Sequence, residues 1–177
     1  ADEEADLEVV IEEAFSKVPP FRPEPDTASV LKAVKLLAQT ERPVIVAGGG
    51  VTYSGAGEEL IELAEKLSIP VATSLNAKET FPSDHPLAVG VCGLYARDCA
   101  NQTVGEADLV FFIGSHTGGQ VTNEWRIPRQ GTHVIQLDIN PAELGRSFPI
   151  VAGLHGDVKA SLRKMIDLAE PMSHADW

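Results

Sequence analysis

Along the chain, stretches with apolar residues at helical spacing take turns with short runs of consecutive apolar residues. Apolar residues recur at helical spacing from Asp26 onward, and the same spacing returns over about 57–67, 96–105 and 158–169. Short apolar runs without alternation separate these stretches, at 44–47, 70–73, 108–113, 133–137 and 150–152. Such runs are typical of strands that helices cover on both faces. The pattern therefore predicts strands and helices that alternate five times.

The first predicted helix has boundaries that follow from its residues. Asp26 is placed to cap its start, and Arg42-Pro43 ends it, because proline has no backbone N–H to donate. Its apolar face is predicted to consist of Val30, Leu31, Val34, Leu37 and Ala38. Residues 74–95 show no such pattern and are expected to be irregular. Helices that alternate with apolar strands through right-handed crossovers predict an α/β fold, a Rossmann-like three-layer domain with a mainly parallel sheet.

The first 26 residues differ from the rest in charge and proline content. They hold nine acidic residues against Lys17 and Arg22, and so account for seven of the twelve net negative charges. Four prolines between positions 19 and 25 predict an extended connector, because proline fixes φ and removes a donor. A solvated acidic leader and a linker from an upstream domain both stay open. A short helix over 5–15 is also predicted, with one face formed by Leu7, Val10, Ile11 and Ala14.

Composition and charge narrow the class of protein. The 177 residues, 44% apolar and 23% charged, fit one globular domain. No run approaches the roughly 18 apolar residues of a membrane helix, and a net charge of −12 disfavours nucleic acid and anionic membrane as partners. Cys92 and Cys99 form neither a CxxC pair nor a metal-ligand cluster, which predicts a cytoplasmic protein without a metal site. Without a histidine or serine motif of a known hydrolase, no catalytic residue is predicted.

The loops that follow the predicted strands are where a ligand is expected, because parallel sheets bind ligands at the carboxyl ends of their strands. The first loop begins with Gly48, Gly49 and Gly50. Glycines let backbone N–H groups approach a phosphate, and the following helix adds positive potential. The dinucleotide fingerprint is not matched, since Tyr53 stands where its third glycine belongs, and no Walker lysine follows. A phosphate cradle and a plain tight turn both stay open.

Three further loops supply the remaining candidate residues. His116, after the third predicted strand, is the best placed of the five histidines. Asp138 lies at the tip of the fourth, where a carboxylate commonly accepts hydrogen bonds from ribose hydroxyls. Asn140 follows it and also fits the N-cap of a short helix. Gly156 and Asp157 form the last loop, in which Asp157 either caps the final helix or faces an adenine.

Several motifs keep a particular order along the chain. They are Arg42–Gly50, Ile69–Ser74, Phe81–Leu87 with Gly90 and Gly93, Ala107–Val110 with Ile113 and Gly114, Val134–Arg146, and Gly156–Val158. As a set, over about residues 27–168, they resemble the central domain of thiamine-diphosphate-dependent enzymes such as acetolactate synthase, pyruvate oxidase, oxalyl-CoA decarboxylase and benzoylformate decarboxylase. The resemblance implies a six-stranded sheet, whose sixth strand has no firm place in this sequence. It also implies a linker over 1–26, the central domain over 27–170 and a tail over 171–177.

The enzymes of this family build their active site from two other domains. The Pyr domain supplies a glutamate that activates thiamine diphosphate, and the PP domain carries a GDG motif and an Asn that hold magnesium and the diphosphate. Here Gly156-Asp157 is followed by Val158, which leaves no room for that motif. The resemblance therefore implies an excised domain of a decarboxylase or carboligase of 2-keto acids that is not catalytic alone. Its implied partners are the Pyr and PP domains of the same parent chain, in a homo-oligomer.

Family members differ in what the central domain binds. It binds FAD in acetolactate synthase and pyruvate oxidase, ADP in oxalyl-CoA decarboxylase, and nothing in several decarboxylases. By residue matching, an adenosine would meet Gly48–Gly50, Asp138, Asn140 and the Gly156-Asp157 loop. Flavin-binding relatives carry an arginine and acidic residues where this chain has Ser115–Gly118, which disfavours FAD. A mainly structural domain and a free-standing or regulatory FAD-, NAD- or ADP-binding domain both stay open, whereas a sirtuin-like deacylase would need four zinc-binding cysteines.

Overall fold

A computed structural model describes residue 6, residues 8–174 and residue 177. In this part of the chain six strands form one sheet, all parallel, in the order β3-β2-β1-β4-β5-β6. The strands are β1 Pro43–Ala47, β2 Val71–Thr73, β3 Ala88–Val91, β4 Leu109–Ile113, β5 His133–Asp138 and β6 Ala152–His155. The predicted α/β class and the six-stranded parallel sheet are thereby confirmed.

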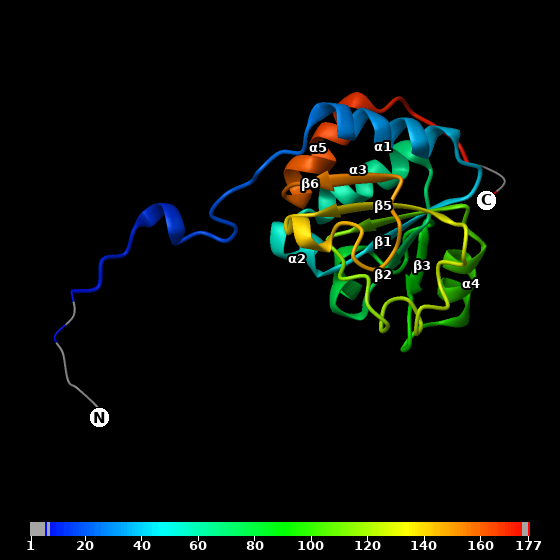
Figure 1. Ribbon diagram of the computed structural model, residues 1–177, viewed down its shortest axis with the longest axis horizontal. Coiled ribbons are helices and arrows are strands. Elements are labelled where there is room, and N and C mark those ends of the chain that lie inside the picture. Colours follow the sequence, from blue (N-terminus) through cyan, green and yellow to red (C-terminus); the bar gives the residue numbers. More distant parts are fainter. Residues whose placement is uncertain (1–5, 7, 175–176) are drawn as a thin grey trace.

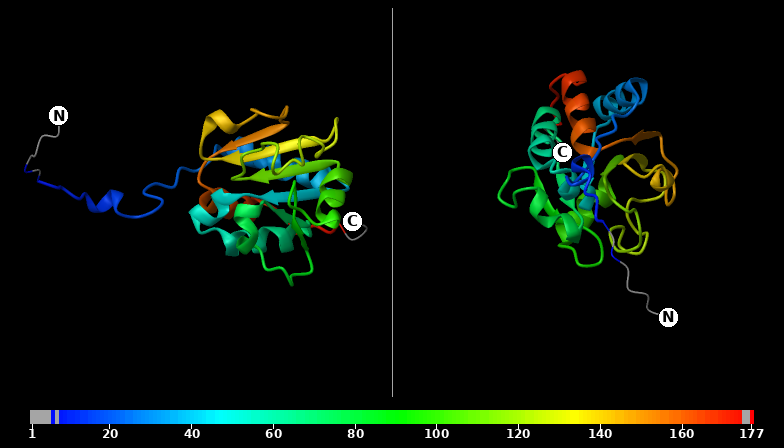
Figure 2. Two further views of the ribbon diagram at one scale, coloured as in Figure 1. Left: turned by 90° about the horizontal axis from the view of Figure 1, so that it is seen from below. Right: turned by 90° about the vertical axis from the view of Figure 1, so that its left-hand side faces the viewer.

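Helices cover both faces of this sheet, which gives the three layers seen in Figures 1 and 2. One face is covered by α1 Thr27–Gln39, α3 Gly57–Leu67 and α5 Val158–Leu168, and the other by α4 Asp98–Glu106 with the loop that follows β4. The remaining turns of helix are short: α2 Gly49–Ser54 and the 3-10 turns η1 Glu13–Phe15, η2 Leu75–Thr80 and η3 Pro141–Glu143.

Successive residues of the central strands point to opposite faces and build two separate cores. Ile45 and Phe111 pack with α1, α3 and α5 on one face. Val46 and Phe112 pack with α4 and with Val121 on the other. Every residue of β1 and β4 is buried. Both faces of each strand are therefore apolar, which explains why the sequence shows unbroken apolar runs there instead of alternation.

The sixth strand, which could not be located from the sequence, is β3. It lies inside the stretch over 74–95 that was expected to be irregular. It lies at an edge of the sheet, is only half-buried and contains Gly90. The chain reaches it from β2 through the 3-10 turn η2, so the helix that usually separates parallel strands gives no cue here. The last strand, β6, starts at Ala152, where the predicted run over 150–152 ends.

The first helix begins as predicted, because the backbone N–H of Ser29 donates to Asp26 Oδ2 at 2.8 Å. Its buried face is narrower than predicted. Leu31 and Ala38 are exposed, so their placement in the core was wrong. The buried residues of α1 are Val30, Ala33, Val34 and Leu37.

The N-terminal segment extends away from the body of the domain, at the end where α2 lies (Figure 1). Within its described part, the predicted helix over 5–15 is wrong, because only the single turn η1 forms. Val10 and Ile11 are exposed, so a helix here would have nothing to pack against, and packing supplies most helix stability. Ala5 and Leu7 of that prediction lie outside the described residues. Across residues 6, 8–174 and 177, no helix is both long and apolar enough to cross a membrane.

Candidate functional site

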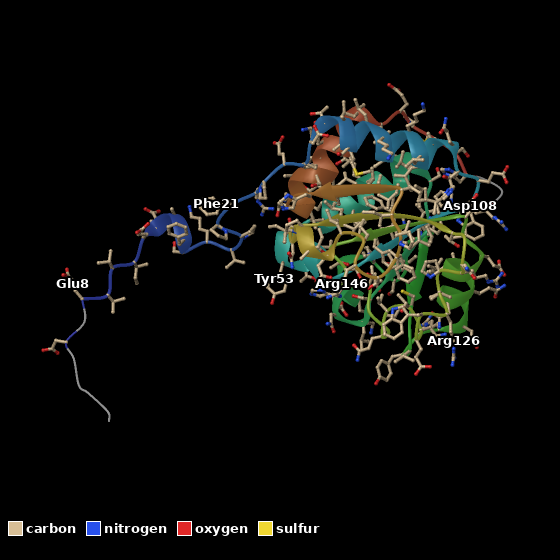
Figure 3. The ribbon with its side chains drawn as sticks, viewed as in Figure 1. Glu8, Phe21, Tyr53, Asp108, Arg126 and Arg146 are labelled. Carbon is tan, nitrogen blue, oxygen red and sulfur yellow. The ribbon has the colours of Figure 1, made fainter. Side chains whose placement is uncertain are left out.

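The order of the strands reverses between β1 and β4, because β2 and β3 continue to one side and β5 and β6 to the other. Loops that leave neighbouring strands at such a reversal diverge and open a crevice. A cleft of about 1070 Å³ lies here, lined by residues from the loops that follow all six strands. In Figure 3, Tyr53 of this cleft lies at the end of the body that faces the N-terminal segment, and Asp108 lies at the opposite end.

Six of the eight candidate residues line this cleft: Gly49, Gly50, His116, Asp138, Asn140 and Asp157. Gly48 and Gly156 are not among the lining residues and pack against other backbone instead. These residues are far apart in the sequence and come together because they follow the carboxyl ends of parallel strands.

The glycine run packs the loop after β1 against the loop after β4. The N–H of Gly48 donates to Ile113 O at 2.8 Å, and that of Gly50 donates to Gly114 O at 2.9 Å. A Cβ on Gly48 would lie 2.3 Å from the oxygen of Gly114. Two of the three N–H groups are therefore used inside the protein, which favours the tight turn over a phosphate cradle. The run also starts α2, which the sequence did not predict because glycine is a poor helix former.

Asp138, at the end of β5, is the acidic group of the cleft. It is 9% exposed, and its Oδ1 accepts the backbone N–H of Asn140 at 2.9 Å. Burial raises the pKa of the Asp138 carboxyl; the Asn140 N–H opposes this shift, and the nearby Glu143 carboxylate adds to it. Asn140 itself caps η3, because its Oδ1 accepts the N–H of Ala142. Asp138 is the better placed of the two to meet a ligand.

Glu143, near Asp138, and its partner Arg146 were not among the candidate residues. Glu143 is only 5% exposed, and its Oε2 lies 3.1 Å from His116 Nδ1 and 3.0 Å from Arg146 Nη2. This oxygen has no hydrogen bond of good geometry among the described residues. Its contact with Arg146 is an ion pair, and its contact with His116 is one only when that imidazole is protonated. His116 is 79% exposed at its side chain and lines the cleft. The sequence predicts a short helix that Asn140 caps, and nothing in that pattern indicates a contact between Glu143 and His116.

Asp157 is 2% exposed and is surrounded by protein donors. Its Oδ1 accepts Arg22 Nη1 at 2.8 Å and the N–H of Ala160 at 3.0 Å, and its Oδ2 accepts Ser54 Oγ at 2.7 Å. It caps α5, as one of its two predicted roles requires. Arg22 and Ser54 lie 135 and 103 residues away in the chain, and no local motif could have paired them with Asp157.

The rim of the cleft is apolar and open. Tyr53, Leu75 and Tyr95 line it and are exposed. Val18 and its two following prolines line it too, although the sequence placed them in a linker. With Asp138 at one position and exposed apolar groups around it, the cleft suits a ligand that has a flat apolar part and hydroxyl groups.

Within the described part of the chain, no three His, Cys, Asp or Glu side chains lie close enough to share a metal ion. The carboxylates of Asp138 and Asp157 in the cleft both accept hydrogen bonds from protein groups. Burial raises the pKa of the Cys92 thiol to about 12, so this cysteine is neutral at physiological pH.

Comparison with known proteins assigns the chain to a family. The family model described as "Thiamine pyrophosphate enzyme, central domain" matches residues 30–165. The chain therefore belongs to the thiamine pyrophosphate enzyme family, as a central domain, and the resemblance read from its motifs is confirmed.

Named relatives agree with this assignment. The chain is 41% identical to the "Probable acetolactate synthase large subunit" of Methanocaldococcus jannaschii, over 93% of this chain and 28% of the relative. It is 35% identical to glyoxylate carboligase of Escherichia coli O157:H7, over 91% of this chain and 27% of the relative. The solved benzoylformate decarboxylase of Polynucleobacter necessarius shares the fold, with a TM-score of 0.69 at 22% identity, over 99% of this chain and 32% of that one. The chain thus spans less than a third of each of these proteins.

Proposed function

We propose that this chain is the central domain of a thiamine-diphosphate-dependent decarboxylase or carboligase that acts on 2-keto acids, and that it is not catalytic by itself. The observation that carries the proposal is the similarity to acetolactate synthase and glyoxylate carboligase sequences across nine tenths of the chain. Thiamine diphosphate and magnesium would then be held by the Pyr and PP domains of a longer parent chain.

Turnover tests this function. The chain alone, supplied with thiamine diphosphate, magnesium and pyruvate or glyoxylate, is expected to release no more CO₂ than buffer does. The longer polypeptide from the same gene is expected to decarboxylate one of these 2-keto acids. Release of CO₂ by the chain alone, or an inactive but folded longer polypeptide with every 2-keto acid tried, contradicts the proposal.

A second function, binding of a nucleotide in the cleft, is favoured by the position of Asp138. A partly buried carboxylate at the tip of β5, beside an apolar rim, suits the ribose hydroxyls and the base of a nucleoside. The phosphates would receive little help from the glycine turn, because the N–H groups of Gly48 and Gly50 are already bonded. ADP is therefore a better probe than FAD, because its terminal phosphates can stay in solvent, whereas the diphosphate of FAD lies between two large groups.

Replacing Asp138 with asparagine tests the nucleotide function. Calorimetric titration is expected to show saturable ADP binding to the unaltered chain and about tenfold weaker binding to Asp138→Asn, because a charge-assisted hydrogen bond is lost.

Thermal unfolding of the same variant separates the loss of ADP binding from damage to the fold. Burial raises the pKa of Asp138 in the folded state, so the stability of the unaltered chain falls as pH rises through that pKa. Asp138→Asn lacks this ionisation. The variant should therefore melt at a higher temperature than the unaltered chain at pH 7 and lose this advantage towards pH 4. Asp84→Asn, at an exposed turn, is the control. Absence of ADP binding to the unaltered chain contradicts the nucleotide function.

A further inference from the structure

One wall of the cleft does not come from the loops of the sheet. Val18, Pro19 and Pro20 of the N-terminal segment line the cleft together with Tyr53 of α2. Val18 is 78% exposed and Tyr53 is 77% exposed, although both line it. Their apolar surfaces are therefore open to a molecule in the cleft, and exposed apolar surface beside polar groups marks binding sites.

This wall is held by the side chain of Arg22, two residues after Pro20. Arg22 Nη1 donates to Asp157 Oδ1 at 2.8 Å and to Ser54 Oγ at 3.0 Å. Ser54 Oγ in turn donates to Asp157 Oδ2 at 2.7 Å and accepts the N–H of Lys159 at 2.8 Å. The Asp157 carboxylate is buried, whereas the Arg22 side chain is 39% exposed. Loss of Arg22 would leave a buried charge without its cation, which is costly.

The backbone after Arg22 is fixed as well. Pro23 O accepts the N–H of Asp157 at 2.7 Å, and Pro25 O accepts Lys164 Nζ at 3.0 Å. A Cβ on Gly156 would lie 2.9 Å from Pro23 O, so the chain at the start of α5 runs directly against the N-terminal segment. These contacts set the direction in which the preceding residues enter the cleft.

We propose that Val18–Arg22, here named the strap, is part of the ligand site, and that Arg22 is the positioning residue that keeps the strap against the cleft. The proposal rests on the nucleotide function suggested for this cleft. The strap supplies an apolar surface for a flat ring such as a nucleoside base, while Asp138 meets the hydroxyl groups. Occupancy of the cleft and order of the strap are then coupled, so each favours the other.

Limited chymotrypsin digestion tests the anchor without any ligand. Phe21 lies in the strap and packs against Phe15, so the exposed Trp125 in the loop after β4 serves as the internal reference. Asp157→Asn keeps a helix cap and leaves both cleavage sequences unchanged, but it removes the charge that holds Arg22. Cleavage after Phe21, relative to cleavage after Trp125, is expected to rise about fivefold in the variant. An unchanged ratio overturns the proposal.

Titration with ADP tests the link to the ligand. Arg22 does not itself line the cleft, so a change in affinity on its replacement reports the strap. Arg22→Gln is expected to weaken ADP binding about fivefold, and Arg22→Lys, which keeps the positive charge, to restore most of it. Affinity in Arg22→Gln equal to that of the unaltered chain overturns the proposal. If the unaltered chain does not bind ADP but the digestion ratio still rises, the strap is supported as a wall of the cleft and the nucleotide function alone fails.

Discussion

Replacing Gly48 with alanine is expected to lower the free energy of unfolding by about 3 kcal/mol. The new Cβ would lie 2.3 Å from Gly114 O and 2.5 Å from Ser115 Cα, closer than real Cβ atoms come. Both are backbone atoms of the loop after β4, so no side chain can rotate away to make room. The hydrogen bond from Gly48 N–H to Ile113 O fixes the two loops at this distance. Urea unfolding followed by circular dichroism measures the loss.

The neighbouring glycine provides the matched control for this change. A Cβ on Gly49 meets nothing within 4 Å, and Gly49 is the first residue of α2. Gly49→Ala is therefore expected to leave stability unchanged or raise it by up to about 1 kcal/mol, since alanine favours helix. Equal stability of the two variants would show that the loops after β1 and β4 can separate at little cost. The packing role assigned to the glycine run would then be wrong.

The part of the fold that could be predicted is the part that local pattern determines. β1 and β4 are buried on both faces, so each must be apolar at every position, and this shows in the sequence as an unbroken run. β3 lies at the edge, is half-buried and contains Gly90, so its residues are under weaker constraint. In the loop after β4, Asn123, Glu124 and Trp125 all have positive φ. Asparagine adopts this conformation more readily than most residues, but nothing in the sequence indicates it for Glu124 and Trp125.

The same distinction applies to the candidate site. Asp138 could be found because it directly follows an apolar strand, and the carboxyl-end rule turns that position into a place beside a cleft. The contact between His116 and Glu143 could not, because it depends on how the loops after β4 and β5 meet in space. The role of Arg22 could not be predicted for a further reason. It lies in a proline-rich segment that reads as a connector, and its partner Asp157 is a buried residue 135 positions later in the chain.

Removal of the Asp157 side chain is expected to lower the free energy of unfolding by about 2–3 kcal/mol, because two losses combine. Asp157→Ala deletes the cap of α5, worth about 1 kcal/mol, and the charge-assisted bonds that the buried carboxylate accepts from Arg22 and Ser54. Asp26 separates these contributions, since it caps α1 from an exposed position and has no such distant partners among its hydrogen bonds in the described residues. Asp26→Ala should therefore give a clearly smaller shift of the urea midpoint. Equal shifts for the two variants would mean that Asp157 acts only as a cap and that Arg22 contributes nothing to the stability of the domain.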